Sequence, residues 1–145
     1  MKNINWARFI LGGLIATAVL FVSDGLLHEQ VLRTDWKAVY DGLGAKEPAE
    51  TPVSMLYFAI FEVGRGVMSI FIYVLMRDRF GAGPKTAVFA GISTWLAFSI
   101  TGPAQFIPLE FYSHALWVKV GAFQLVTSIV AAIIAASLYK DVTDR

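Results

Sequence analysis

The chain has 145 residues, of which 57% are hydrophobic and 16% are charged, and its formal net charge at pH 7 is +1. A soluble domain of this length could not bury so much apolar surface, so the composition predicts a membrane protein whose main partner is the lipid bilayer. The small net charge and the lack of a basic, aromatic-rich stretch give no reason to expect nucleic acid as a partner. The absence of cysteine excludes disulfides, thiolate catalysis and cysteine-ligated metal centres.

Four apolar stretches are long enough to cross a bilayer as helices. They lie at about residues 6–31, 53–76, 86–103 and 111–139, with a longer connection over 32–52. Short turns between the later stretches predict an all-α, four-helix transmembrane bundle with up-down-up-down order, forming one domain over 1–145. The third stretch contains Gly102-Pro103 and Pro108, so it either ends near Thr101 or continues as an irregular segment.

The first stretch has a competing interpretation as a signal peptide. Lys2 and Arg8 precede a short apolar run that contains Ala16-Thr17-Ala18, a possible cleavage site of the A-x-A type. The apolar run continues past this site to Val22, which favours a retained helix, and we expect the helix to be retained.

The connection 32–52 is too charged to lie in hydrocarbon. Thr34 or Asp35 can cap the start of a short helix there, and Gly44 can end it. One side of this helix carries Trp36, Val39, Tyr40 and Leu43. The pattern predicts an amphipathic helix on the membrane surface, although a loop helix that caps the bundle would make the same contacts.

The distribution of basic residues predicts the orientation, because lysine and arginine gather in cytoplasmic loops. One side of the membrane would carry Lys2, Arg8, Arg77, Arg79, Lys85, Lys140 and Arg145, and the other Arg33, Lys37 and Lys46. We therefore expect both termini to be cytoplasmic and the connection 32–52 to lie outside.

The second stretch carries ionisable residues near its centre. Glu62 and Arg65 are three residues apart, so they share one helix face and can form a pair, and Ser69 and Tyr73 continue that face. Ionisable side chains at this depth are costly unless they are paired or face a polar interior, so they indicate an internal polar site.

The fourth stretch has a polar face of its own, spaced alternately by four and three residues, which predicts that this face points into the bundle. Its members are Glu110, His114, Trp117, Gly121, Gln124 and Ser128. Lys119 lies nearly opposite, and we expect its side chain to reach the outer headgroups.

Together these faces predict a polar pocket that opens outwards and binds a small ligand or ion. Its floor would be Glu62 and Arg65, with Asp24, His28 and His114 near its mouth. The full set of predicted ligand-binding residues is Glu62, Arg65, Asp24, His28, His114, Gln124 and Tyr73.

Several alternatives use the same residues. His28, His114, Asp24 and Glu110 could hold zinc or iron, and the two histidines alone could be axial ligands of a haem. A membrane-embedded acid–base enzyme would need the same charged groups. In an accessory or structural subunit, as part of a homo-oligomer or a membrane complex, Arg65 would pair with Glu62 or Asp24 only to fix helix packing.

Two segments resemble a known family. One is Gly25-Leu26-Leu27-His28 followed by Asp35-Trp36-Lys37-Ala38 and Leu43-Gly44, and the other is Arg79-Phe80-Gly81-Ala82-Gly83-Pro84-Lys85-Thr86-Ala87 leading to Gly91 and Trp95. Together they resemble a family of small bacterial four-helix membrane proteins of unknown function. The resemblance implies four spans and a bacterial inner membrane, and it carries no catalytic residue or cofactor.

Overall fold

The computed structural model describes residues 4–44 and 51–141, and all regular structure in these ranges is helical. The long helices are α1 (Trp6–Leu26), α3 (Pro52–Phe80), α4 (Pro84–Trp95) and α6 (His114–Leu138). Shorter pieces are α2 (Arg33–Gly42), α5 (Gly102–Ala104) and a 3₁₀ turn, Ile107–Leu109. Two π-helical segments extend α1 and α4, over Leu27–Val31 and Leu96–Thr101.

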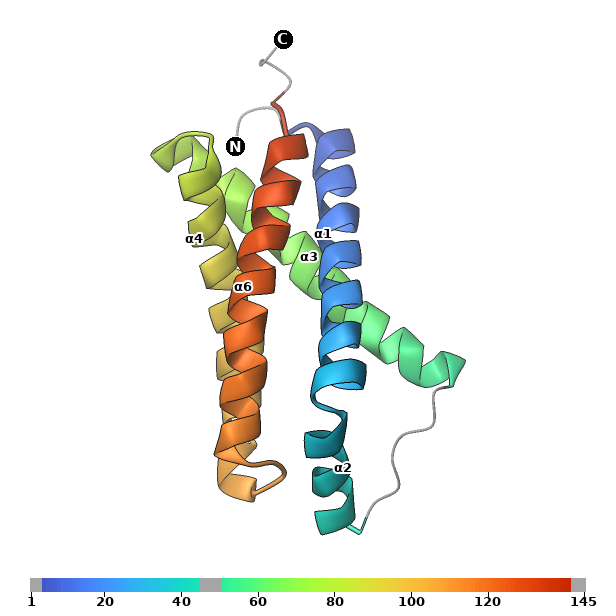
Figure 1. Ribbon diagram of the computed structural model, residues 1–145. Helices are drawn as coiled ribbons and strands as arrows, with labels where there is room; N and C mark the ends of the chain where they lie inside the picture. Colours follow the sequence, from blue (N-terminus) through green and yellow to red (C-terminus); the bar gives the residue numbers. More distant parts are fainter. Residues whose placement is uncertain (1–3, 45–50, 142–145) are drawn as a thin grey trace.

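Four helical segments are long and apolar enough to cross a membrane, which confirms the predicted fold class. They are Trp6–Val31, Pro52–Phe80, Pro84–Leu109 and His114–Leu138. Successive segments run in opposite directions, and the first and last described residues lie at the same end of the bundle (Figure 1).

Local sequence signals set the helix ends. The side chains of Asn5 and Ser113 accept hydrogen bonds from backbone N–H groups in the first turns of α1 and α6, and Thr51 forms a capping box with Ser54 at the start of α3. Gly81 and Gly83 have φ values of 85° and 141°, and this left-handed backbone allows the tight turn between α3 and α4.

Two glycines allow the helices to cross at close range. A Cβ atom on Gly66 of α3 would lie 2.6 Å from the Thr17 nitrogen and 2.8 Å from the Gly13 carbonyl oxygen of α1. A Cβ on Gly91 of α4 would lie 2.7 Å from the Cα of Ile129 in α6. The helix backbones therefore pack directly against each other at these two points, as small residues permit in membrane bundles.

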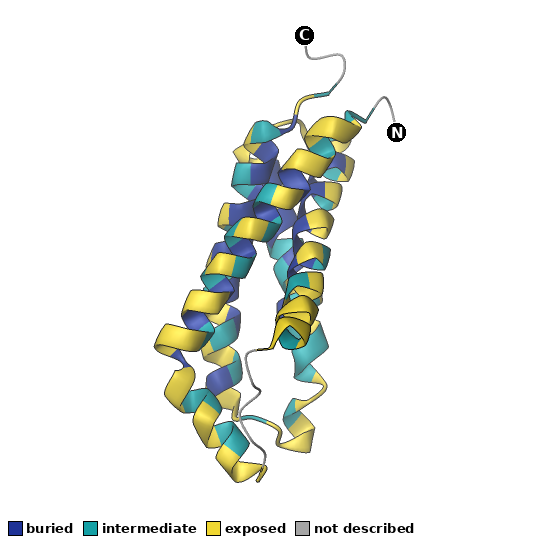
Figure 2. Cartoon of the chain, turned by 90° about the vertical axis from the view of Figure 1, so that its right-hand side faces the viewer, coloured by how far each residue is buried: buried dark blue, intermediate teal, exposed yellow. Residues whose placement is uncertain are grey.

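The main core lies in the half of the bundle that carries the termini. It contains residues from all four long helices, among them Leu20, Ile70, Ala87 and Ala131, and Figure 2 shows the buried residues concentrated there. Helix α3 crosses the others obliquely (Figure 1), and its first turns, Val53–Phe61, are mostly exposed.

Helix α2 confirms the predicted short helix in the first connection, although it begins one residue before Thr34 and has no side-chain cap. It lies beyond the end of α1 (Figure 1). Trp36 and Val39 pack against a small cluster formed by Leu27, Leu32 and Leu116. The apolar side of α2 thus contacts the bundle, as expected of a helix that caps it.

The last two spans differ from their predicted limits. Helix α6 begins at His114 because Glu110 has a left-handed backbone with a φ of 55° and Ser113 supplies the cap. Glu110 therefore lies outside the helix on whose polar face it was predicted. The third span continues beyond Thr101 as an irregular segment, which was one of the two predicted alternatives.

Candidate functional site

A buried charge cluster connects three helices at mid-bundle. The Arg65 side chain is 0% exposed, and its Nη1 lies 2.6 Å from Oδ2 of Asp24 and 2.8 Å from Oε1 of Glu62. Its Nη2 donates to Oγ of Ser128 at 3.3 Å. Asp24 comes from α1, Glu62 and Arg65 from α3, and Ser128 from α6. Both predicted pairings of Arg65 are confirmed, and they occur together.

The cluster contains two acids and one base, and its hydrogen bonding is incomplete. Within the described part of the chain, Asp24 Oδ1, Arg65 Nε and Ser69 Oγ are buried and have no hydrogen-bond partner. The guanidinium carbon of Arg65 also lies 5.6 Å from the centre of the Phe61 ring, which is cation–π range. Buried ion pairs of this kind specify helix packing more than they add stability.

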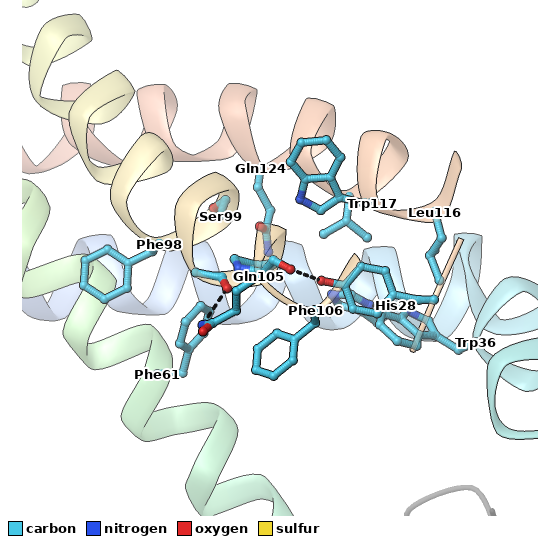
Figure 3. Close-up of a pocket in the computed structure, with 14 residues that line it drawn as sticks. His28, Trp36, Phe61, Phe98, Ser99, Gln105, Phe106, Leu116, Trp117 and Gln124 are labelled. Atoms are coloured by element: carbon cyan, nitrogen blue, oxygen red, sulfur yellow. Dashed lines mark hydrogen bonds between the residues drawn. The ribbon is translucent and has the colours of Figure 1, made fainter. Parts of the chain in front are cut away.

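A cavity of about 430 Å³ lies next to the cluster, at the end of the bundle away from the termini. Residues from the π-helical segment after α1, from α2, α3 and α6, from the irregular end of the third span and from the loop before α6 line it, and most of them are aromatic or aliphatic (Figure 3). They are His28, Trp36, Phe61, Phe98, Ser99, Gly102, Pro103, Gln105, Phe106, Tyr112, Leu116, Trp117, Val120 and Gln124.

Gln124 joins the cavity to the charge cluster. Its side chain lines the cavity, and its Nε2 donates a hydrogen bond to Oδ2 of Asp24. Neither Glu62 nor Arg65 is among the lining residues. The prediction that these two residues form the floor is therefore corrected, because both are buried and Arg65 is engaged by Asp24, Glu62 and Ser128.

Polar side chains are few among the residues that line the cavity. Ser99 Oγ and Trp117 Nε1 are buried and have no hydrogen-bond partner among the described residues. His28 Nδ1 accepts a hydrogen bond from Trp36 Nε1 at 2.6 Å. Because Nδ1 is an acceptor, the imidazole is neutral and carries its proton on Nε2.

Both π-helical segments lie at this cavity. One contains His28 and the other contains Phe98 and Ser99. A π-helical turn holds one more residue than an α-helical turn, so it changes which side chains face inwards, and such turns are frequent at functional sites. Neither π-helical segment was predicted from the sequence, and Ser99 was missed for this reason.

The loop before α6 closes one side of the cavity. The hydroxyl of Tyr112 donates to the Pro103 carbonyl oxygen at 2.7 Å, and Gln105 Nε2 donates to the Gly102 carbonyl oxygen at 3.0 Å (Figure 3). Burial raises the pKa of Tyr112 above its ordinary value, so its hydroxyl stays protonated and keeps this hydrogen bond at neutral pH.

Three residues predicted at the site lie elsewhere. His114 and Glu110 are exposed and do not line the cavity. Tyr73 is buried in the core at the opposite end, where its hydroxyl accepts a hydrogen bond from the Gly83 N–H at 3.3 Å. The spacing of His114 and Glu110 assumed a continuous helix, which the left-handed backbone at Glu110 interrupts.

The predicted metal and haem ligands are also separated. Over residues 4–44 and 51–141, no three histidine or acidic side chains come close enough together to form a metal site. Of the two histidines, His28 lines the cavity and His114 does not. Asp24 is engaged by Arg65 and Gln124. In the described part of the chain, the side chains predicted to bind a metal or a haem are therefore not gathered at one site.

Lys119 faces outwards, as expected, but it has a protein partner. Its Nζ lies 2.9 Å from Oδ2 of Asp35 in α2, and both side chains are partly exposed. This ion pair ties the first connection to α6.

The chain matches no known protein-family model, no curated protein and no solved structure, so the resemblance to small bacterial membrane proteins remains a prediction.

Proposed function

We propose that this protein is an integral membrane protein that binds a small lipid-soluble molecule in the cavity between α1, α6 and the third span. The observation that carries the proposal is a largely apolar cavity of about 430 Å³, two of whose lining residues, Ser99 and Trp117, have buried polar side-chain atoms without a hydrogen-bond partner in the described chain. Small-molecule sites generally combine an apolar lining of this size with a few polar groups that orient the ligand.

The lining favours a ligand that enters from the bilayer. Its apolar lining includes Phe61, Phe98, Phe106 and Leu116, which all belong to the candidate membrane-spanning segments. The polar side chains in the sequence suggested a small ligand or an ion, but Asp24, Glu62 and Arg65 do not line the cavity. In this proposal their role is to hold α1, α3 and α6 together beside the cavity.

We further propose a bacterial inner-membrane location with both termini cytoplasmic. Arg8, Arg77, Arg79, Lys85 and Lys140 all belong to the end of the bundle that carries the termini, as the positive-inside rule requires of the cytoplasmic side. The cavity would then lie towards the outer face.

Single cysteines placed at Gly42 and at Gly81 test this orientation, because the chain has no cysteine of its own. An impermeant maleimide should label intact cells only at position 42, and labelling only at position 81 would reverse the topology.

A structural role within a larger membrane assembly is the second candidate. The first turns of α3, including Val53, Leu56, Phe58 and Ile60, are apolar and exposed, and they contact little of the described chain. In a membrane assembly, a neighbouring subunit or a second copy of the chain would cover these side chains. In a protein that acts alone, lipid would cover them. Ligand binding in the purified protein would distinguish the first candidate from this one.

Quenching of tryptophan fluorescence by bromodecane tests the proposal, because Trp36 and Trp117 line the cavity. Wild-type protein in mild detergent should show a saturable component of quenching above the linear component caused by probe in the micelle. Val120→Phe narrows the cavity and should weaken the saturable component. Val118→Phe is the matched control, since Val118 lies on the same helix, is 59% exposed and does not line the cavity. Quenching without saturation, or equal quenching of both variants, would refute the proposal.

A further inference from the structure

The polar groups of the cavity also indicate the chemistry of its ligand. We infer that the ligand is a neutral, largely apolar molecule with a carbonyl oxygen, held by hydrogen bonds from Ser99, Trp117 and His28. This inference rests on the proposed function, because it assumes that the cavity binds a small molecule.

Two of the lining residues carry donors that have no partner within the described chain. Trp117 Nε1–H can only donate, and it is buried without a partner in the described chain. Ser99 Oγ is buried in the same way and can also donate. A buried donor without a partner costs about 1–3 kcal/mol, so a ligand that supplies an acceptor recovers this loss.

His28 adds a donor of fixed direction. Its Nδ1 accepts from Trp36 Nε1, and the Nε2 proton is therefore available on the other side of the ring. Trp36 also contacts His28 through its ring, with the centroids 5.4 Å apart, so α2 holds the imidazole in place from outside. A carbonyl oxygen has two lone pairs and can accept from two of these donors at once.

The charge of the lining also restricts the ligand. Among the described residues, no lysine, arginine, aspartate or glutamate lines the cavity. The Arg65 guanidinium does not line the cavity, and its charge is already paired with the carboxylates of Asp24 and Glu62. A carboxylate or an ammonium group would therefore be buried without a counter-charge, which is costly, whereas a neutral carbonyl would not.

Three probes of equal chain length separate these properties: bromodecane, a bromodecanone and bromodecanoate, each with bromine at the end of the chain. Saturable quenching of tryptophan fluorescence gives the affinity of each. We expect the ketone to bind wild-type protein more tightly than the alkane, and bromodecanoate to bind most weakly. Ser99→Ala should weaken ketone binding about two- to tenfold, the range for one neutral hydrogen bond, and leave alkane binding unchanged.

Trp117→Phe is a second, independent variant, which removes the N–H and keeps an aromatic ring. Trp36 remains as the fluorescent reporter. We expect Trp117→Phe to lower the affinity for the ketone about two- to tenfold, as Ser99→Ala does, and to leave the affinity for the alkane unchanged. Thr101→Ala is the control, because its hydroxyl already donates to the Ala97 carbonyl oxygen at 2.7 Å and it does not line the cavity.

The outcomes distinguish this inference from the proposed function. Equal binding of ketone and alkane, unchanged in both variants, would overturn the carbonyl assignment while leaving apolar binding intact. Tighter binding of bromodecanoate than of the ketone would overturn the assignment of a neutral ligand. Failure of all three probes to give saturable quenching would overturn the proposed function itself.

Discussion

Arg65→Met tests the buried charge cluster most directly. Arg65 is fully buried, and a single nitrogen, Nη1, contacts the carboxylates of both Asp24 and Glu62. The variant would leave these two carboxylates together in an apolar surrounding without their counter-charge. Breaking a buried ion pair by removing one partner costs about 3–5 kcal/mol, and one charge at mid-bilayer costs about 2.5–3.5 kcal/mol. We therefore expect Arg65→Met to lower the free energy of unfolding by about 3 kcal/mol.

Two further variants show whether charge burial is the cause. Lys119→Met breaks the ion pair with Asp35, whose members are 52% and 36% exposed, and should cost no more than about 1 kcal/mol. Adding Asp24→Asn and Glu62→Gln to Arg65→Met removes the unpaired carboxylates, and this triple variant should recover most of the lost stability.

The measurement is equilibrium unfolding of each variant in mixed micelles of a mild detergent and sodium dodecyl sulfate, followed by circular dichroism. Arg65→Met should unfold at a clearly lower fraction of the denaturing detergent than Lys119→Met. If the two variants were equally stable, or if the triple variant were no more stable than Arg65→Met, the cluster would not be the buried ionic network described here.

Three other predictions concern stability. Gly66→Ala should lower the free energy of unfolding by about 1–3 kcal/mol in the same assay, because the new Cβ would meet the α1 backbone. Gly64→Ala, whose Cβ would make only ordinary contact with Phe98, should be neutral or slightly stabilising. Equal effects of the two variants would contradict the close crossing of α1 and α3. Ser113→Ala should cost about 1 kcal/mol through loss of the α6 cap, and no change would show that the cap is not formed. Burial, aided by the hydrogen bond to Asp141, raises the pKa of Tyr139, so the folded state holds this proton more tightly. Stability should therefore be complete below the unfolded pKa of about 10 and fall as the pH rises through the folded pKa, and Tyr139→Phe should reduce that fall; identical alkaline unfolding curves would refute this.

The sequence was sufficient for the four spans and for the Arg65 pairings. Long apolar stretches allow few structures in a bilayer, because every backbone group must be bonded internally. An arginine beside a glutamate at mid-span must find a partner, and the three-residue spacing supplied one. The second partner, Asp24, followed from the same need, since it is an acid near the end of the first span.

The cavity could not be predicted in the same way. Phe61 and Phe98 are apolar, and on a membrane helix an apolar residue can face lipid or a cavity equally well. Ser99 lies in a π-helical segment, whose extra residue per turn depends on tertiary packing and breaks the 3.6-residue periodicity used to assign faces. The left-handed backbone at Glu110 was not predicted either, and it places Glu110 outside α6.

Mass spectrometry of the organic extract from the protein, purified with surrounding lipid in polymer discs, tests the central claim most directly. Wild type and Val118→Phe should carry a neutral carbonyl compound that is enriched over the bulk membrane extract, and Val120→Phe should be depleted of it. Extracts of all three proteins that contain the same compounds in the same proportions as the membrane would contradict the claim that this cavity binds a small lipid-soluble molecule.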